Sequence, residues 1–317
     1  SRCSSPGCRR PRRTRTSASK PDVGYDERLT LSDGRITWYL DEGEGDAVPV
    51  VFCHGSPSSR LAAIDHVSRV VTRGGRIIAP DRPGLGRSER ETGRALAGWA
   101  GDVAELMNHL RCARFRVLAV SGGGPYALAL AWALPDRVER VALLSSPGSF
   151  DIPGAMDGMA RAHRITWLLA RRQPRLLSWM LSRQRAGLED DAERFTKAIV
   201  ESMHDADRDA LEALDTGGQR RFITAPLVEA LAEGTDGAVE DLRVLRAPWG
   251  FGVQDIRVPV HLWHGEADDA TPRQMGGWLA AMIPDADAHF LSGEGHVSTI
   301  LRYADEAVEA LLPDDGG

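Results

Sequence analysis

Long apolar runs, cysteine and lysine are all scarce in this sequence. No stretch of about 18 or more apolar residues occurs, so we expect no membrane span. Only four of the 317 residues are cysteines, and no cysteine–histidine spacing indicates a metal site. Lysine occurs only at Lys20 and Lys197, which we attribute to coding bias toward arginine. These absences predict a protein with no metal and no other cofactor, in a reducing, cytoplasmic compartment.

Positive charge is also in the minority. The net charge at pH 7 is −6, which argues against nucleic acid as a partner. The first 20 residues are an exception, because they contain seven basic residues and no acidic one. They have too few apolar residues to form a core, so residues 1–22 are predicted to be a disordered basic tail. The remaining length suits one large domain, with or without an inserted subdomain.

The most informative segment that is present covers residues 115–130. An apolar run ends at Ser121, three glycines and Pro125 follow, and an alanine- and leucine-rich stretch of high helix propensity comes next. The glycines let strand and helix approach closely, and Pro125 suits the first helical turn. We therefore expect a strand, a tight turn and a helix, with the hydroxyl of Ser121 at the apex of the turn.

A glycine-rich turn of this kind has two interpretations. It can cradle a phosphate at the helix N-terminus. However, Ser121 stands where Gly-x-Gly-x-x-Gly needs its first glycine, and no lysine follows as in Gly-x-x-x-x-Gly-Lys. The segment Ala119-Val-Ser121-Gly-Gly123 resembles instead the nucleophile elbow of the α/β-hydrolase superfamily, with Ala119 in place of the usual first glycine. That resemblance implies that Ser121 is a catalytic nucleophile.

The rest of the sequence alternates between strand-like and helix-like segments. A hairpin is expected at residues 28–40, around Ser-Asp-Gly at 32–34. The later alternation implies a mostly parallel sheet with helices on both faces. The expected strands are residues 48–53, 76–79, 115–120, 138–144, 258–263 and 289–291, and the expected helices are 60–72, 96–110, one ending at 133, 272–282 and one from about 297.

This alternation is interrupted between residues 146 and 246, where no convincing strand occurs. The pattern favours helices at residues 159–170, 174–182, 189–204, 207–214 and 219–233. A helical insert between two parts of one sheet resembles the cap of an α/β-hydrolase. The implied fold is the α/β-hydrolase fold with an inserted all-helical cap. Its divisions are a tail at 1–22, a first core part at 23–147, the cap at 148–247 and a second core part at 248–317.

A serine nucleophile needs a base within hydrogen-bonding distance, and the base needs an orienting carboxylate. The superfamily supplies them after later strands, in the order serine, acid, histidine. Gly265-Glu-Ala-Asp268 and Gly293-Glu-Gly-His296 follow two expected strands, at the edge of the sheet where sites form. The resemblance implies Asp268 as the acid, with Asp269 as the next choice, and His296 as the base. The histidines expected in helices, and therefore at the surface, are His66, His109, His163 and His204.

Two further motifs resemble parts of the superfamily. The turn His54-Gly-Ser-Pro57 resembles its His-Gly-x-Pro motif, which implies that the backbone N–H groups of Ser56 and Gly122 form the oxyanion hole. In that arrangement His54 is a structural residue of the loop. The loop Asp81-Arg-Pro-Gly-Leu-Gly-Arg-Ser88 resembles the family's Asp-x-x-Gly-x-Gly-x-Ser loop, whose role is architectural.

The identity of the nucleophile narrows the chemistry. Epoxide hydrolases and haloalkane dehalogenases of this fold need a carboxylate at the apex, so Ser121 argues against both. A serine favours an acyl-enzyme, and we expect a carboxylic ester hydrolase for a small hydrophobic substrate, acting as a monomer or homodimer. The alternatives are a C–C bond hydrolase, an acyltransferase or an aminopeptidase with the same triad, and a catalytically silent ligand-binding protein.

The cap should determine specificity, but its composition is ambiguous. Residues 158–188 carry seven arginines and no acid, interleaved with apolar residues, which could attract acidic substrates or a membrane surface. Residues 189–215 carry ten acids, so we expect the two stretches to neutralise each other. The segment Pro248-Trp-Gly-Phe251, at the return to the core, either lines the pocket or fills a hinge.

Overall fold

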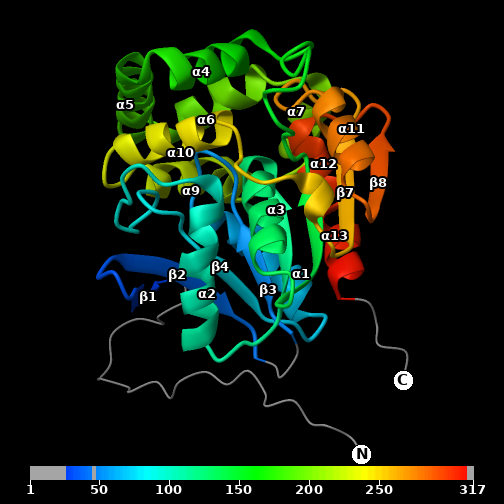
Figure 1. Ribbon diagram of the computed structural model, residues 1–317. Coiled ribbons are helices and arrows are strands. Elements are labelled where there is room, and N and C mark those ends of the chain that lie inside the picture. The colour runs from blue at the N-terminus through cyan, green and yellow to red at the C-terminus, as the bar shows by residue number, and fades with distance from the viewer. Residues whose placement is uncertain (1–25, 45–47, 313–317) are drawn as a thin grey trace, which may run out of the picture.

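An eight-stranded sheet runs through the molecule (Figure 1) in the order β1-β2-β4-β3-β5-β6-β7-β8. The computed structural model describes residues 26–44 and 48–312, so the predicted tail at 1–22 lies outside the described residues. β1 and β4 each pair antiparallel with β2, and every other pairing is parallel, as predicted. The strands are β1 (Glu27–Thr30), β2 (Ile36–Glu42), β3 (Val50–Cys53), β4 (Ile77–Pro80), β5 (Phe115–Val120), β6 (Val138–Leu144), β7 (Val260–Gly265) and β8 (Ala286–Leu291).

Helices cover both faces of the sheet, which is why its central strands are apolar without alternation. Successive residues of β5 point into two different cores, Val117 and Ala119 into one and Leu118 and Val120 into the other. The first core lies under α2 (Trp99–His109), α3 (Gly124–Ala133) and α11 (Arg273–Met282). The second lies under α1 (Ile64–Val71), α12 (His296–Arg302) and α13 (Ala304–Leu311).

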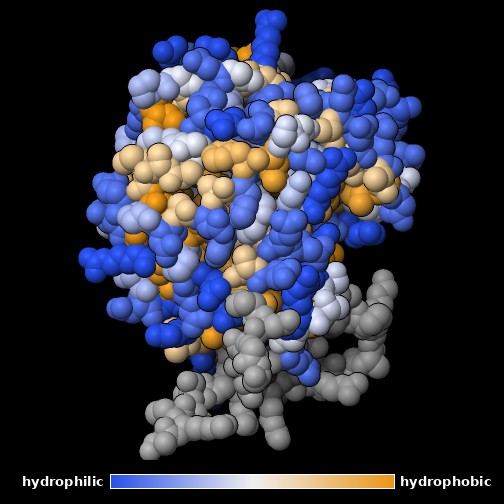
Figure 2. Space-filling view, turned by 90° about the vertical axis from the view of Figure 1, so that its right-hand side faces the viewer, coloured by the Kyte–Doolittle hydropathy of each residue, from blue (hydrophilic) through white to orange (hydrophobic). Residues whose placement is uncertain are grey.

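The edge strand β8 differs from the central strands. Its residues alternate between half-buried and exposed along most of its length, and the exposed positions carry Asp287 and His289. Figure 2, which faces the side of α11 and β8, shows a mainly hydrophilic surface with hydrophobic residues among it. Charged side chains on an edge strand discourage pairing with a second sheet.

Between β6 and β7 the described chain contains helices and no strand, and we call residues 148–247 the helical insertion. It lies above the sheet in Figure 1, at the ends of β5, β6 and β7 that lead into loops of the site. Its helices are α4 (Arg161–Arg172), α5 (Pro174–Asp190), α6 (Ala192–Glu201), α7 (Asp205–Glu212), α8 (Thr216–Gln219), α9 (Ala225–Ala230) and α10 (Asp236–Arg246).

Three features of the insertion differ from prediction. α5 continues to Asp190, beyond the end expected at residue 182, and α6 begins at Ala192 rather than at residue 189. The helix predicted at 219–233 is broken by a π-helical turn at Arg220–Thr224, because Pro226 has no N–H to continue the α-helical ladder. α10 was not predicted, although Val239, Leu242 and Leu245 recur at helical spacing.

Charge in the insertion is also arranged differently from expectation. Of the seven arginines at 158–188, only Arg185 forms an ion pair with the acidic stretch within the described residues, with Glu189. This pair is the one direct ion pair between the two stretches among the described residues, and the carboxylate of Asp207 accepts backbone N–H groups at residues 296–298 instead. Among the described residues, no helix combines the length and apolar composition that crossing a membrane requires.

The segment at 248–251 packs against the core helices. The ring of Trp249 lies 5.8 Å from that of Phe251 and 5.9 Å from that of Trp278 on α11. Phe251 stacks on Trp132 of α3 at 5.4 Å. These contacts favour the hinge interpretation of the segment over the pocket-lining one.

Candidate active site

Ser121 stands at the end of β5, on the sharp turn into α3. Its φ is +50°, a left-handed conformation that is rare for a residue with a side chain. The following glycines allow the close packing that this turn needs. A Cβ atom on Gly123 would lie 2.1 Å from the carbonyl oxygen of Cys53, and one on Gly124 would lie 1.8 Å from the Oγ of Ser146. The strained turn thus holds the Ser121 hydroxyl outside the core.

Ser121, His296 and Asp268 form a continuous hydrogen-bonded chain. The Nε2 of His296 lies 2.9 Å from the Oγ of Ser121, and its Nδ1 lies 2.8 Å from the Oδ2 of Asp268. The three residues come from loops after β5, β7 and β8, as the motif positions predicted. In this arrangement His296 can accept a proton from the hydroxyl of Ser121, and Asp268 can orient His296.

The carboxylate of Asp268 is held on both oxygens. Its Oδ1 accepts the N–H groups of Ala270 (2.9 Å) and Thr271 (2.7 Å), and its Oδ2 also accepts the hydroxyl of Thr271 (2.8 Å). The neighbouring Asp269 is half-buried, and its carbonyl accepts the N–H of Ala160 (2.7 Å). Asp268, not Asp269, therefore hydrogen-bonds the histidine. Thr271 was not singled out from the sequence, where a threonine three residues after the acid carries no distinctive signal.

The pKa shifts of Asp268 and His296 agree with the hydrogen bond between them. Burial would raise the pKa of Asp268, but contact with His296 and the hydrogen bonds from Thr271 reverse this, and its pKa lies below the usual 3.8. Burial would lower the pKa of His296, but the carboxylate of Asp268 outweighs it, and the pKa of His296 is raised above its usual 6.5. A charged Asp268 would therefore stabilise the protonated form of His296.

The predicted oxyanion residues lie together beside Ser121. A Cβ atom placed on Gly122 would lie 3.2 Å from the backbone nitrogen of Ser56, so the two residues touch. A Cβ on Gly55 would lie 3.9 Å from the Oγ of Ser121, so the turn after β3 packs directly against Ser121. All five residues predicted for the site are thus close to one another.

The remaining motif residues support this turn. The Nε2 of His54 accepts the N–H of Arg82 at 3.3 Å, and its Nδ1 lies 2.9 Å from the carbonyl of Gly55. Burial holds the pKa of His54 well below 6.5, so it is neutral. The guanidinium of Arg82 donates to the carbonyls of His54 (2.5 Å) and Gly55 (2.8 Å). The side chains of both residues bond the backbone around the loop, and neither hydrogen-bonds to Ser121.

One expectation about the other histidines is wrong. His66 is buried at 3% exposure, because α1 lies on the sheet and the ring packs 5.0 Å from that of Phe52. His109, His163 and His204 are exposed as expected. Within the part of the chain that the structure describes, no three His, Cys, Asp or Glu side chains are grouped as a metal site would require.

Two carboxylates of the helical insertion reach the loops of the site and were not identified from sequence. Asp207 of α7 accepts the backbone N–H of His296 at 3.1 Å. Asp241 of α10 accepts the hydroxyl of Ser56 at 2.5 Å. Sequence separations of 89 and 185 residues leave no local pattern that relates these pairs.

Residues 50–311 match the family model described as "Alpha/beta hydrolase family". The chain is 29% identical over 284 residues to a 2-hydroxymuconate semialdehyde hydrolase of Pseudomonas putida, covering 88% of this chain and 90% of that protein. It is 38% identical over 120 residues to a non-heme chloroperoxidase of Streptomyces lividans, covering 37% and 44%. The solved structure of a hydrolase from Pseudomonas aeruginosa matches with a TM-score of 0.68 at 21% identity, covering 92% and 100%.

These matches cover different fractions of the relatives' length. The chain spans 41% to 49% of the length of the first four curated relatives that it matches, the chloroperoxidase among them. The semialdehyde hydrolase is matched over nearly its whole length. At 21% identity the solved structure supports the fold alone.

Proposed function

This chain belongs to the alpha/beta hydrolase family, and from that premise we propose that it is a serine hydrolase acting on a carboxylic ester, or a related acyl bond, of a small hydrophobic substrate. The observation that carries the proposal is the chain of hydrogen bonds from Ser121 through His296 to Asp268. The helical insertion adjoins the oxyanion residues, because the Cδ1 of Leu245 on α10 lies 3.3 Å from the position of a Cβ atom on Gly122.

The first half of the reaction forms an acyl-enzyme. The Oγ of Ser121 attacks the substrate carbonyl carbon while the Nε2 of His296 accepts the hydroxyl proton. Negative charge develops on the carbonyl oxygen, where the N–H groups of Ser56 and Gly122 stabilise it. The tetrahedral intermediate then collapses, the bond to the leaving alcohol breaks, and His296 returns its proton to the leaving oxygen.

The second half releases the acid. Water takes the place of the alcohol, His296 removes a proton from it, and the resulting oxygen nucleophile attacks the acyl carbon. Collapse breaks the bond to the Oγ of Ser121, which recovers its proton from His296. We further propose that the helical insertion acts as the cap that selects the substrate, since Leu245 and Asp207 both come from it.

The proposal is tested with Ser121→Ala and with the surface variant Ser182→Ala as a matched control. Ser121→Ala is expected to abolish hydrolysis of p-nitrophenyl acetate and labelling by a fluorophosphonate, while its circular dichroism spectrum stays that of the wild type. Ser182→Ala is expected to retain both. Wild-type turnover by Ser121→Ala would rule the assignment out, and absence of labelling in the wild type would favour a silent binding protein.

A C–C bond hydrolase is the second candidate, because the semialdehyde hydrolase of Pseudomonas putida is matched over most of both chains. The two candidates separate by product analysis. Cleavage of a vinylogous diketone into two acidic or carbonyl products, at rates exceeding those for a series of esters, would favour C–C hydrolysis. Faster turnover of the esters would favour the first proposal.

A further inference from the structure

We propose that two carboxylates of the helical insertion, Asp241 and Asp207, are positioning residues for the reaction. Asp241 holds the turn that presents the Ser56 N–H to the oxyanion, and Asp207 holds the backbone that presents His296 to the nucleophile. The inference rests on the proposed function, since it assigns residues that act through Ser56 and His296.

Asp241 lies at the centre of a buried network. Its carboxylate is fully buried. Its Oδ2 accepts the hydroxyl of Ser56 at 2.5 Å and the Nη2 of Arg82 at 2.8 Å. Its Oδ1 accepts the Nη2 of Arg94 (2.8 Å), the Nε of Arg82 (2.9 Å) and the hydroxyl of Tyr126 (2.8 Å). Burial would raise the pKa of Asp241, but the two guanidinium groups hold it far below its usual range, so it is charged.

The same network fixes the turn after β3 from both sides. Arg82 donates to Asp241 and also to the carbonyls of His54 and Gly55. Ser56, the next residue, is tied to Asp241 through its own side chain. The peptide unit between Gly55 and Ser56, which carries the Ser56 N–H, is therefore restrained at its carbonyl oxygen and at the side chain next to its nitrogen. Orientation of this N–H determines how well it stabilises the oxyanion.

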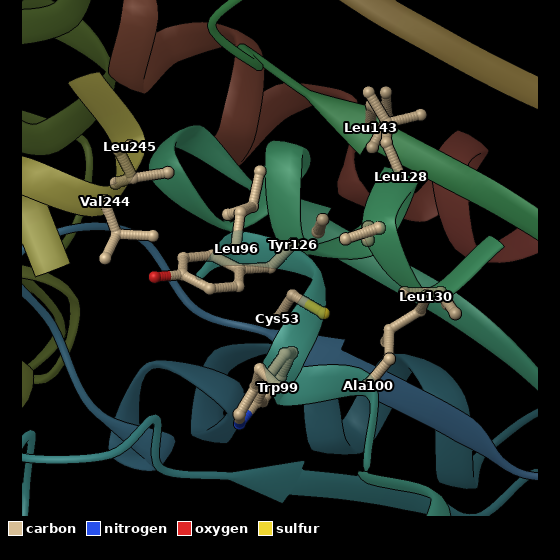
Figure 3. Packing of buried hydrophobic residues seen from close by; sticks show 14 of the residues in the cluster. Cys53, Leu96, Trp99, Ala100, Tyr126, Leu128, Leu130, Leu143, Val244 and Leu245 are labelled. Atoms are coloured by element: carbon tan, nitrogen blue, oxygen red, sulfur yellow. The ribbon is translucent and has the colours of Figure 1, made fainter. Parts of the chain in front are cut away.

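α10 reaches this turn because of an unusually close helix-to-loop contact. A Cβ atom on Gly237 would lie 1.7 Å from the carbonyl oxygen of Gly84, so only glycine lets the helix approach. Gly237, Asp241 and Leu245 are four residues apart and share one face of α10. They contact Gly84, the Ser56 turn and Gly122 in that order. Figure 3 shows the hydroxyl of Tyr126 directed from α3 toward Val244 and Leu245 of α10.

Asp207 makes an equivalent contribution at the other catalytic loop. α12 begins at His296 and its capping position is occupied by Gly295, which has no side chain to accept the first N–H groups. The carboxylate of Asp207 accepts them instead, with Oδ2 at 3.1 Å from the N–H of His296 and Oδ1 at 2.9 Å from those of Val297 and Ser298. Asp207 belongs to α7, yet it accepts the N–H groups of α12 that an N-cap side chain of α12 would normally accept.

The two carboxylates have distinguishable consequences. Asp207 lies beside His296, so its charge contributes to the raised pKa of that imidazole, whereas Asp241 faces the oxyanion turn. The charged and titratable groups that face His296 are Asp268 and Asp269 from the loop after β7, Asp207 from α7, His163 from α4 and His264 from β7. Removing the charge of Asp207 should therefore lower the pKa of His296, whereas removing the charge of Asp241 should leave that pKa unchanged.

The test compares Asp241→Asn and Asp207→Asn by kcat, KM and the pH dependence of kcat/KM for p-nitrophenyl acetate. Asp241→Asn is expected to lower kcat by about 10–100-fold with little change in KM and an unchanged acid limb. Its Ki for a phenyl trifluoromethyl ketone, which forms a tetrahedral oxyanion on Ser121, should rise by the same factor. Asp207→Asn is expected to shift the acid limb of the kcat/KM profile to lower pH. It should lower kcat by a smaller factor than Asp241→Asn does.

The controls are surface carboxylates on the same helices. Asp236→Asn on α10 removes an exposed pair with Arg90, and Asp205→Asn on α7 removes an exposed pair with Arg208. Both are expected to keep wild-type kcat and pH profile. If Asp241→Asn does not fold, Ser56→Ala deletes the same hydrogen bond without altering the buried charge, and its kcat should fall with KM preserved.

Wild-type kcat and Ki in Asp241→Asn, or in Ser56→Ala where the first variant is unfolded, would overturn the role of Asp241. An unshifted acid limb in Asp207→Asn would overturn that of Asp207. Either result together with an inactive Ser121→Ala would leave the proposed function standing. Activity in Ser121→Ala would instead refute the proposed function itself.

Discussion

Replacing Asp268 by asparagine should invert the hydrogen-bonding role of His296. The Oδ1 position accepts two backbone N–H groups, from Ala270 at 2.9 Å and Thr271 at 2.7 Å. In Asp268→Asn these donors keep the amide oxygen at Oδ1, so the amide NH₂ occupies the Oδ2 position, 2.8 Å from the Nδ1 of His296. The Thr271 hydroxyl can accept its second hydrogen, because it has the carbonyl of Ser145 at 3.1 Å to donate to.

The consequence is a base of the wrong tautomer. With an N–H donor opposite it, Nδ1 must accept, so Nε2 carries the proton and can no longer accept one from Ser121. Loss of the correct tautomer in a serine triad costs about 10⁴ in kcat, or about 5.5 kcal/mol of transition-state stabilisation. The backbone hydrogen bonds are retained, so the protein should stay folded.

The assay is kcat for p-nitrophenyl acetate at neutral pH, with Asp269→Asn as the neighbouring control and thermal unfolding as the measure of integrity. Asp268→Asn should lose about four orders of magnitude, whereas Asp269→Asn should stay near the wild type. A folded Asp268→Asn with activity within tenfold of the wild type would refute the assignment of Asp268 as the orienting acid.

Further predictions concern pH and stability. Because the pKa of His296 is raised above 6.5 and the neutral base is required, kcat/KM should fall as the pH decreases through a value above 6.5, and an acid limb below 6.5 would contradict this. Gly124→Ala should lower the free energy of unfolding by about 1–3 kcal/mol, since its Cβ would lie 1.8 Å from the Oγ of Ser146. Gly101→Ala, which has open space at that position in α2, should raise it by about 1 kcal/mol in urea denaturation. If both variants changed the free energy of unfolding equally, the close contact between Gly124 and Ser146 would not be what makes Gly124→Ala destabilising.

The parts of the site that lie at strand ends could be predicted from sequence. Ser121 follows β5 directly, and Asp268 and His296 lie in the loops after β7 and β8, so topology alone brings them to one edge of the sheet. Ser56 and Gly122 could be assigned because the elbow and the turn after β3 have recognisable residues. These positions depend on local patterns, which a single sequence contains.

The contributions of the insertion could not be predicted for a physical reason. Asp207 and Asp241 are ordinary helix-surface acids in sequence, and their burial depends on which face of α7 and α10 meets the core. α10 was missed although its apolar spacing is helical, because its first residues, Asp236 and Gly237, resemble a turn. Gly237 is required by a contact with Gly84, 153 positions earlier, which no local rule reveals.

The contact between Gly84 and Gly237 also restricts how this protein can be recombined with its relatives. A chimaera that receives residues 236–246 from a parent with any side chain at position 237 would keep that helix away from the loop at 81–88. Arg82 and Arg94 would then remain buried without their shared carboxylate. The loop at 81–88 and the helix at 236–246 must therefore come from the same parent. Crossover points that separate them should yield poorly folded hybrids, even between close homologues.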